Sequence, residues 1–201
     1  MHKSIVRSCA FAGASLISLS LAAAAENAMM PASAMKPAAV AASDRKLISS
    51  ARTAAPRSVA AIATIVVMGP DGTMRTVRPG TGSFTCMPDN PTTPGPDPMC
   101  MDRYAMEWVQ AWATHKTPTP GRVGFIYMLA GDTGTSNHDP QQRESHQHWV
   151  QTGPHVMIVG PAVKEMTGYP RTADVADAAQ PYVMFPGTPY EHLMLPVTAP
   201  K

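Results

Sequence analysis

The chain has 201 residues, 44% of them hydrophobic, with sixteen Lys and Arg against fourteen Asp and Glu. So small a net charge, without a contiguous basic run, gives no electrostatic signature of a nucleic-acid partner or of an anionic membrane surface. No apolar run beyond residue 25 reaches the roughly 18 residues that a spanning helix needs, so we expect no transmembrane segment in residues 26–201.

Residues 1–25 have the layout of an export signal peptide. Lys3 and Arg7 form a short basic start, an apolar run follows, and Ala23 to Ala25 supply a small-residue exit. This order predicts cleavage near Ala25 and a periplasmic or secreted location. The mature chain would then carry fourteen basic and fourteen acidic residues, because the signal contains two basic residues and no acidic one.

Residues 26–56 are rich in Ala, Met, Pro and Ser. Such a segment has little to bury, so we predict a flexible leader with a helical turn or two near Arg45 to Arg52. A single globular domain is expected over residues 57–201. The mature chain keeps Cys86 and Cys100, which an oxidising compartment would join in a disulfide, with a redox pair or a metal pair as alternatives.

The first predicted elements of this domain form a hairpin. The β-branched run 64–68 and the alternating residues 73–78 flank Gly69-Pro70-Asp71-Gly72, in which Pro presets one dihedral angle and Gly accepts a positive φ. A short strand over 83–87 follows. The proline-dense residues 88–99 then predict a loop, because proline is disfavoured in helices and in interior strands alike.

The main helix is expected to start at Asp102, as its N-cap, and to run to about His115. Tyr104, Trp108 and Trp112 share one face of it, where core packing is the first interpretation and a ligand pocket against the sheet is the alternative. The remaining pattern predicts strands over 123–130, 155–159, 182–185 and 192–195, a long polar loop over 131–154 and a short helix over 172–179. The fold class is therefore α+β: an antiparallel sheet of about five to seven strands with one main helix, about 102–115, packed on it.

A set of short motifs stands out between roughly Ala54 and Val197. They are Phe84–Asp89, Asp97–Cys100, Tyr127–Leu129, Ser136–Asn137, Asp139–Pro140, Thr152–Met157 and Gly187–Tyr190. Together they resemble an uncharacterised family of secreted bacterial proteins. The resemblance implies an exported single domain whose Cys86/Cys100 loop matches the family's pattern, and it implies no activity and no ligand.

Two of the predicted strands repeat one pattern, His155-x-Met157 and His192-x-Met194. Residues two apart in a strand share a face, so each pair would present an imidazole and a thioether to the same side. That donor set suits copper, above all Cu(I), and neighbouring strands would bring all four side chains together. The alternative is that these side chains fill a core buried on both faces.

A second histidine cluster has the spacing of a zinc site. His146-x-His148 precedes His155, and three neutral imidazoles with a water molecule form a hydrolytic or hydration centre. Polar residues surround the first two histidines, so a solvated loop is the alternative.

Two carboxylate motifs have weaker functional interpretations. Asp132-Thr133-Gly134 is similar to an aspartic protease signature, but a single copy would need a homodimer, and the tripeptide is also a common turn. Asp89, Asp97 and Asp102 near the proline-rich loop could hold a hard cation, although Asp in such loops more often makes local hydrogen bonds. The sequence contains no glycine-rich phosphate loop and no Gly-x-Ser-x-Gly motif.

The sequence therefore predicts an exported soluble domain, more a binding protein than an enzyme, whose partner is a small ligand or a metal and not nucleic acid. The most concrete form of this prediction is copper bound through His155, Met157, His192 and Met194. The competing hypotheses are a zinc-dependent enzyme that uses His146, His148 and His155, and an envelope interaction domain without a metal.

Overall fold

The computed structural model describes residues 42–69, 72–141 and 147–197. These residues belong to one compact unit that spans Ala39–Lys201. The predicted signal peptide and residues 26–41 of the predicted leader lie outside the described residues. No helix in the described part of the chain is long and apolar enough to cross a membrane.

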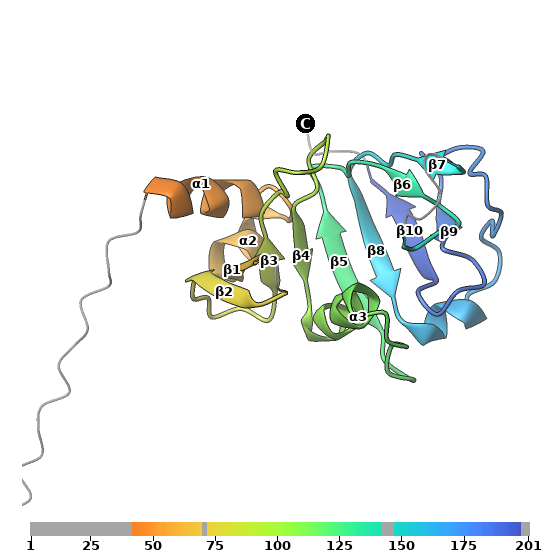
Figure 1. The fold of residues 1–201 in the computed structure, drawn as a ribbon, viewed down its shortest axis with the longest axis horizontal. Helices are drawn as coiled ribbons and strands as arrows, with labels where there is room; N and C mark the ends of the chain where they lie inside the picture. Colours follow the sequence, from red (N-terminus) through yellow and green to blue (C-terminus); the bar gives the residue numbers. More distant parts are fainter. Residues whose placement is uncertain (1–41, 70–71, 142–146, 198–201) are drawn as a thin grey trace, which may run out of the picture. The chain divides into compact units, whose positions relative to one another are not determined.

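The centre of the fold is an eight-stranded sheet in the order β2-β1-β3-β4-β5-β8-β10-β9 (Figure 1). Its strands are β1 Thr64–Met68, β2 Met74–Arg78, β3 Thr85–Met87, β4 Met99–Met101, β5 Gly124–Met128, β8 His155–Val159, β9 Tyr182–Met184 and β10 His192–Pro196. A separate pair consists of β6 Thr135–Ser136 and β7 Trp149–Val150. The predicted hairpin and the four later predicted strands are all present.

The prediction of a purely antiparallel sheet of five to seven strands is wrong in two respects. The sheet is mixed, because β3 runs parallel to β1, and it has eight strands. After β2 the chain moves to the opposite side of β1, where β3 pairs with it, and on the way it passes close to the residues at which β1 begins. A Cβ atom on Gly80 would lie 2.3 Å from the backbone nitrogen of Thr64, so the crossing depends on glycine. The three-residue β4 follows the proline-rich loop and is too short to give a periodic signal.

The principal helix, α3 Arg103–Ala113, is confirmed together with its cap. One carboxylate oxygen of Asp102 accepts a hydrogen bond from the backbone N–H of Ala105 at 2.8 Å, and the other accepts from the N–H of Phe125 at 3.1 Å. Asp102 therefore both caps the helix and ties it to β5. Both carboxylate oxygens of Asp102 thus accept hydrogen bonds from backbone N–H groups. This agrees with the interpretation that these Asp residues make local hydrogen bonds rather than hold a cation.

The helix expected over 172–179 is absent, because local side-chain hydrogen bonds replace the helical ones. Thr172 donates through Oγ1 to the carbonyl of Asp174 at 2.6 Å, and the Asp177 carboxylate accepts from the N–H of Ala179 at 2.9 Å. Such bonds offer the backbone an alternative to the helix. A 3₁₀ helix, η1 Pro161–Glu165, forms instead directly after β8.

The segment predicted as leader contributes to the fold from residue 42. It contains α1 Ala42–Ala51, and α2 Arg57–Ile62 follows. Ala51 and Ala54 are completely buried, and the N–H of Leu129 donates to the carbonyl of Ala54 at 2.9 Å. The folded unit thus begins earlier than the composition suggests, since small alanines can pack closely without a large apolar side chain.

The disulfide is present between Cys86 and Cys100, which face each other directly on β3 and β4. Both residues are fully buried in a cluster with Ile65 and the alanines of the α1–α2 segment. The pair is a structural crosslink inside a core, which agrees with the first of the sequence-based interpretations.

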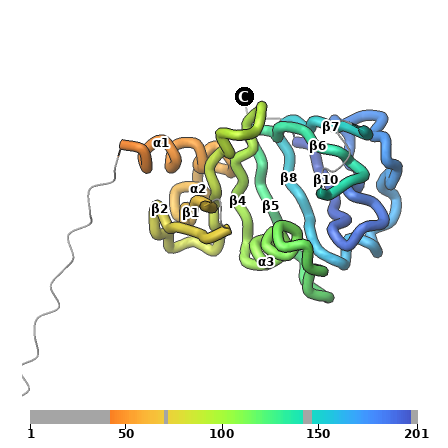
Figure 2. Tube along the Cα trace, viewed as in Figure 1, coloured from red at the N-terminus to blue at the C-terminus, as the bar shows by residue number. Residues whose placement is uncertain are grey.

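The two faces of the sheet are covered differently. One face packs against the α1–α2 segment at one end and against η1 at the other. On the opposite face α3 crosses β4 and β5 (Figures 1 and 2). A Cβ atom on Gly124 would lie 2.2 Å from the backbone nitrogen of Ala105, so glycine is what allows α3 to approach β5.

Helix α3 covers only part of this second face. It has eleven residues, which correspond to roughly 17 Å, and it lies near one end of β4 and β5, while the loop between β3 and β4 lies at the other end (Figure 2). Loops and the side chains of the sheet therefore enclose the remaining space, and this is where the candidate site lies.

Candidate ligand-binding and metal-binding cavity

A cavity of about 350 Å³ lies between the sheet, helix α3 and two loops. This volume is within the range of small-molecule sites, roughly 300–1,000 Å³. Trp108 and Trp112 of α3 line it, so the aromatic helix face combines core packing with a pocket wall. The loops contribute carboxylates and threonines, and the strands contribute seven methionines and two histidines: Met68, Met87, Met99, Met128, Met157, Met184, Met194, His155 and His192.

The two His-x-Met strands of the sequence prediction are neighbours. Strands β8 and β10 pair antiparallel, and Met157 lies directly opposite Met194. His192 is opposite Val159, and His155 is opposite Pro196. All four predicted copper ligands therefore share one face and line one cavity. The two thioethers lie at the middle of the β8–β10 pair, with one histidine towards each end of it.

Sequence reasoning missed further thioethers on the same face. Met128 of β5 is directly opposite His155, and Met87 of β3 is directly opposite Met99 of β4. Met184 of β9 is opposite His192. The period of two shows which residues of one strand share a face with each methionine. Only the strand order shows that methionines of different strands lie side by side across the sheet.

His155 presents an unused ring nitrogen. The residue is completely buried, and its Nδ1 lies 2.7 Å from the carbonyl oxygen of Gly153, so Nδ1 carries the proton and donates it. The buried Nε2 has no hydrogen-bond partner. Burial lowers the pKa of His155 below its usual 6.5, against the opposing effects of the Gly153 carbonyl and of Asp132. The neutral imidazole thus keeps a free lone pair.

Asp132 is the nearest acidic group to this nitrogen. Its Oδ2 lies 4.0 Å from Nε2 of His155, and its Oδ1 accepts hydrogen bonds from the N–H groups of Gly134 at 2.9 Å and Thr152 at 3.1 Å. Burial raises the pKa of Asp132, while His155 and the two backbone donors lower it. The Asp-Thr-Gly motif is therefore a turn that places one carboxylate at the cavity, with Gly134 at a φ of 82°.

His192 is held by aromatic rings. Its Nδ1 donates to the carbonyl of Tyr190 at 2.9 Å, and its ring centroid lies 5.1 Å from that of Trp108 and 5.2 Å from that of Phe185. Burial lowers the pKa of His192 to about 4. Because this imidazole stays neutral at neutral pH, its Nε2 is also a lone-pair donor rather than a cation.

The proline-rich loop contributes one carboxylate, that of Asp97, to the lining of the cavity. Asp97 accepts from the N–H of Asn90 at 2.8 Å and from Oγ1 of Thr93 at 3.0 Å, and its own N–H donates to Asp89 at 2.8 Å. Burial raises the pKa of Asp97, and the neighbouring Asp89 acts in the same direction. These carboxylates are used for hydrogen bonds within the loop, as the turn interpretation predicts.

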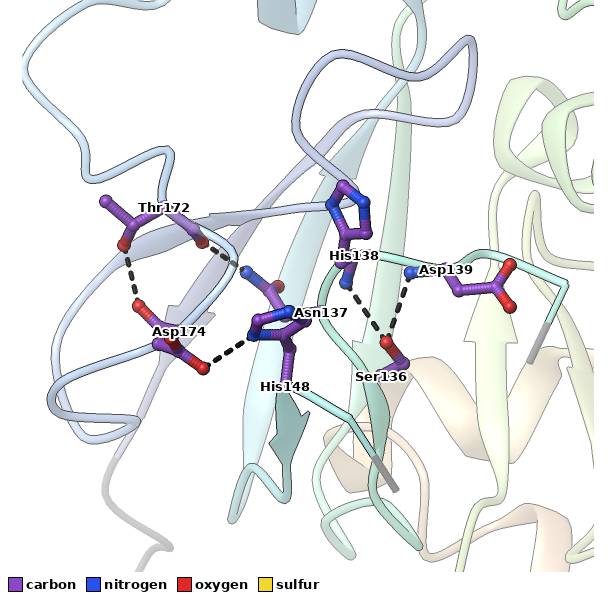
Figure 3. Close-up of polar contacts among 7 residues, drawn as sticks. All are labelled: Ser136, Asn137, His138, Asp139, His148, Thr172 and Asp174. Atoms are coloured by element: carbon purple, nitrogen blue, oxygen red, sulfur yellow. Dashed lines mark hydrogen bonds and ion pairs between the residues drawn. The ribbon is translucent and has the colours of Figure 1, made fainter. Parts of the chain in front are cut away.

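The histidines of the predicted zinc site are distributed differently. His146 lies outside the described residues. Nδ1 of His148 lies 2.7 Å from a carboxylate oxygen of Asp174, and the ring of His148 lies 5.7 Å from that of the exposed His138 (Figure 3). His155, in contrast, is buried in the cavity. Among the described residues, no three His, Cys, Asp or Glu side chains come together as a metal-binding group.

Asn137 organises the chain beside this second cluster. Its amide nitrogen donates to the carbonyl of Thr172 at 2.8 Å (Figure 3). Its backbone N–H donates to the carbonyl of His148 at 2.8 Å, and its carbonyl accepts from the N–H of Phe185 at 3.0 Å. Through one side-chain bond and two backbone bonds, the buried Asn137 thus connects the loop after β6 to three other segments. A single Asn in a polar loop gave no signal of that role.

Unpartnered polar atoms concentrate at the cavity. The described residues contain four buried side-chain polar atoms without a hydrogen-bond partner, and three of them belong to residues that line it: Nε1 of Trp108, Oγ1 of Thr135 and Nε2 of His155. Leaving such a group unpaired costs roughly 1–3 kcal/mol. A bound ligand that pairs with them would recover part of that cost.

Searches for similar proteins found no matching family model, no matching curated protein and no matching solved structure. The chemistry of the cavity itself therefore carries the functional interpretation. That chemistry consists of soft thioethers and neutral imidazoles, with one carboxylate close to an unpaired imidazole nitrogen.

Proposed function

We propose that this protein is an exported binding domain that holds Cu(I) in the cavity, with His155, Met157 and Met194 as its ligands. The observation that carries the proposal is the direct pairing of Met157 with Met194 beside a buried, neutral imidazole whose Nε2 has no partner. Thioethers and imidazole are the protein ligands that select Cu(I) over harder cations. Met128, opposite His155, is a further thioether within the same wall.

The register argues for one imidazole per ion. Residues two apart in a strand are separated by roughly 7 Å, and His155 and His192 lie two such steps apart along the strand pair, on either side of the paired methionines. The two imidazole side chains are too short to reach a single ion across that distance. His155 is the favoured ligand, because the carboxylate of Asp132 at 4.0 Å supplies a counter-charge for the cation.

His192 then has a different role within the same site. Its ring packs between Trp108 and Phe185, so it shapes the apolar wall. The thioether of Met194 is two residues away on the same strand face. A neutral His192 keeps positive charge out of the space that the ion would occupy.

A small organic ligand is the second candidate for this cavity. The volume of about 350 Å³ exceeds what a bare ion needs, and Trp108 Nε1 and Thr135 Oγ1 are unpaired polar atoms that a metal would not satisfy. A compact apolar molecule with one or two acceptor groups would fill the volume and pair with both.

The decisive experiment is titration of the purified mature domain with Cu(I) in competition with a chromogenic Cu(I) chelator. We expect one ion per chain with a Kd below micromolar. The double variant Met157→Leu/Met194→Leu should bind more weakly by at least about tenfold, a loss of about 1.4 kcal/mol or more. Met101→Leu is the matched control, because Met101 is a fully buried methionine on the same sheet and does not line the cavity.

Three outcomes would count against copper. Wild-type affinity weaker than micromolar would end the proposal, and so would equal binding by the double variant and the Met101→Leu control. Stoichiometric zinc in protein purified without chelator would favour the zinc-dependent enzyme instead. If Cu(I) fails and co-purifying organic material is found by mass spectrometry, the second candidate takes its place.

Export is part of the same proposal. The disulfide is compatible with an oxidising compartment, and the first twenty-five residues have the order of a cleaved signal. Mass spectrometry of the protein from the periplasmic fraction should give a chain that begins near Glu26. An uncleaved chain in the cytoplasmic fraction with alkylatable cysteines would contradict it.

A further inference from the structure

The charges of this chain are unevenly distributed along the sequence. Residues 42–78 contain six basic and two acidic residues, whereas residues 79–201 contain seven basic and eleven acidic ones. No basic run marks the first region, because its cations are spaced three or more residues apart except for Arg45 and Lys46. The fold decides where these cations meet.

Three of these cations line one surface cleft. Arg45 and Arg52 come from the α1 segment and Arg57 from α2, around a cleft of about 550 Å³. Ser49 and Thr53 add hydroxyl groups, and apolar side chains form the rest of the lining, which includes no acidic residue. Arg52 directly follows the last residue of α1, and its N–H still donates to the carbonyl of Ile48 at 3.2 Å. Because Arg45 and Arg52 are seven residues apart, close to two helical turns, both reach the same cleft.

The guanidinium groups in the cleft are unopposed. Neighbouring cations in the same region are engaged: Arg75 pairs with Asp44 at 3.1 Å, and Arg78 donates to the carbonyls of Ala60 and Ala63 at 2.8 Å each. Within the described part of the chain, Arg45, Arg52 and Arg57 have neither an ion pair nor a side-chain hydrogen bond.

A fourth positive charge adds to the field of the cleft. Burial lowers the pKa of Arg78, and the positive charge of Arg52 lowers it further, which places these two guanidinium groups within electrostatic reach of each other. Like charges gathered without a counter-charge repel one another. An anion bound in the cleft would relieve that repulsion.

We propose that the cleft formed by Arg45, Arg52 and Arg57 binds a phosphate group. Guanidinium groups match phosphate oxygens through paired N–H donors, and three of them balance a phosphate better than a single carboxylate. Ser49 and Thr53 offer further hydrogen bonds to the same oxygens. The site shares no residue with the methionine-lined cavity, so it is independent of the proposed copper site.

Phosphate reaches an exported protein as the free ion or as the headgroup of an anionic lipid, and the experiment separates the two. The first arm titrates the mature domain with inorganic phosphate at constant ionic strength, followed by calorimetry and by the thermal unfolding midpoint. The second arm measures co-flotation with vesicles of phosphatidylglycerol, with phosphatidylcholine vesicles as the uncharged comparison.

The variants are Arg52→Gln and Arg57→Gln, with Arg103→Gln as the control. Arg103 is an exposed arginine of α3 that pairs with Glu107, four residues on, lies over the ring of Tyr104 and does not line the cleft. Its replacement therefore changes the net charge equally and leaves the cleft intact. We expect each cleft variant to weaken phosphate or vesicle binding by about tenfold, and the control to stay within about twofold. Without phosphate, the cleft variants should unfold at or slightly above the wild-type midpoint, because they remove repulsion.

The outcomes are distinct. Binding of inorganic phosphate that the cleft variants lose supports the free ion as ligand. Binding to phosphatidylglycerol vesicles alone, again lost in the variants, supports the headgroup. If neither probe binds, or if Arg103→Gln loses as much as the cleft variants, the proposal is overturned.

Discussion

The buried His192 makes a sharp prediction about stability and pH. Its side chain is completely enclosed, and burial lowers its pKa from 6.5 to about 4, with His155 acting in the same direction and the Tyr190 carbonyl and Glu191 opposing it. In the unfolded chain the imidazole takes up a proton near pH 6.5. In the folded chain it resists protonation until about pH 4.

The sign and size of the effect follow from this difference. Since the unfolded state binds more protons between pH 6.5 and 4, acid favours unfolding in that window. The stability due to the neutral His192 is fully present above pH 6.5 and is lost as the pH falls towards 4. One pKa unit corresponds to about 1.4 kcal/mol, so the loss from this single residue is about 3 kcal/mol.

The test compares urea unfolding of the wild type with that of His192→Asn at several pH values from 7 to 4. Asn keeps an N–H donor for the Tyr190 carbonyl but does not titrate. We expect the wild-type free energy of unfolding to fall by about 3 kcal/mol more than that of the variant across the window. The contribution of the carboxylates cancels in the comparison, because both chains carry the same ones.

His138→Asn serves as the control, because it makes the same replacement at an exposed histidine. A change in pH dependence as large as that of His192→Asn would show that burial is not the cause. A variant whose unfolding free energy follows the wild-type curve through the whole window would refute the reasoning. His192 would then be protonated in the folded state at the same pH as in the unfolded chain.

Two further predictions concern the scaffold. Reduction of the Cys86–Cys100 disulfide, or its replacement by two alanines, should lower the free energy of unfolding by about 3 kcal/mol in the chain-entropy account of a loop of this length; equal urea midpoints with and without reductant would contradict that. Gly124→Ala should cost about 3 kcal/mol, because its Cβ would overlap the backbone of Ala105 in α3. Gly153→Ala is the control, since its Cβ would meet nothing within 4 Å, and a similar cost in both variants would show that the overlap is not the cause.

Local sequence was a poor guide to the polar loop after β6. His148 lies at a φ of 50°, and its Nδ1 contacts Asp174, which lies 26 residues further on (Figure 3). The zinc prediction assumed that spacing along the chain would keep His148 and His155 together. Instead, the pairing of β7 with β6 and the hydrogen bonds of Asn137 direct His148 towards the 172–174 segment.

The copper hypothesis shows what a strand pattern contains and what it lacks. The period of two places His155 with Met157, and His192 with Met194, whatever the fold. It does not say that β8 and β10 are adjacent, nor that Met157 is opposite Met194 rather than one step away. A pairing slipped by one residue would have put the two thioethers on different faces.

The sequence by itself determined the features that depend on neighbours along the chain. The Asp102 cap, the aromatic face of α3, the hairpin and the alternation of side chains between the two faces of a strand all follow from local backbone geometry and periodicity. Only the tertiary structure decided the strand order, the methionine-lined cavity and the arginine cleft. These arise where segments far apart in sequence pack together, and the free energy of that packing depends on shape and hydrogen bonding between elements, which a linear pattern does not encode.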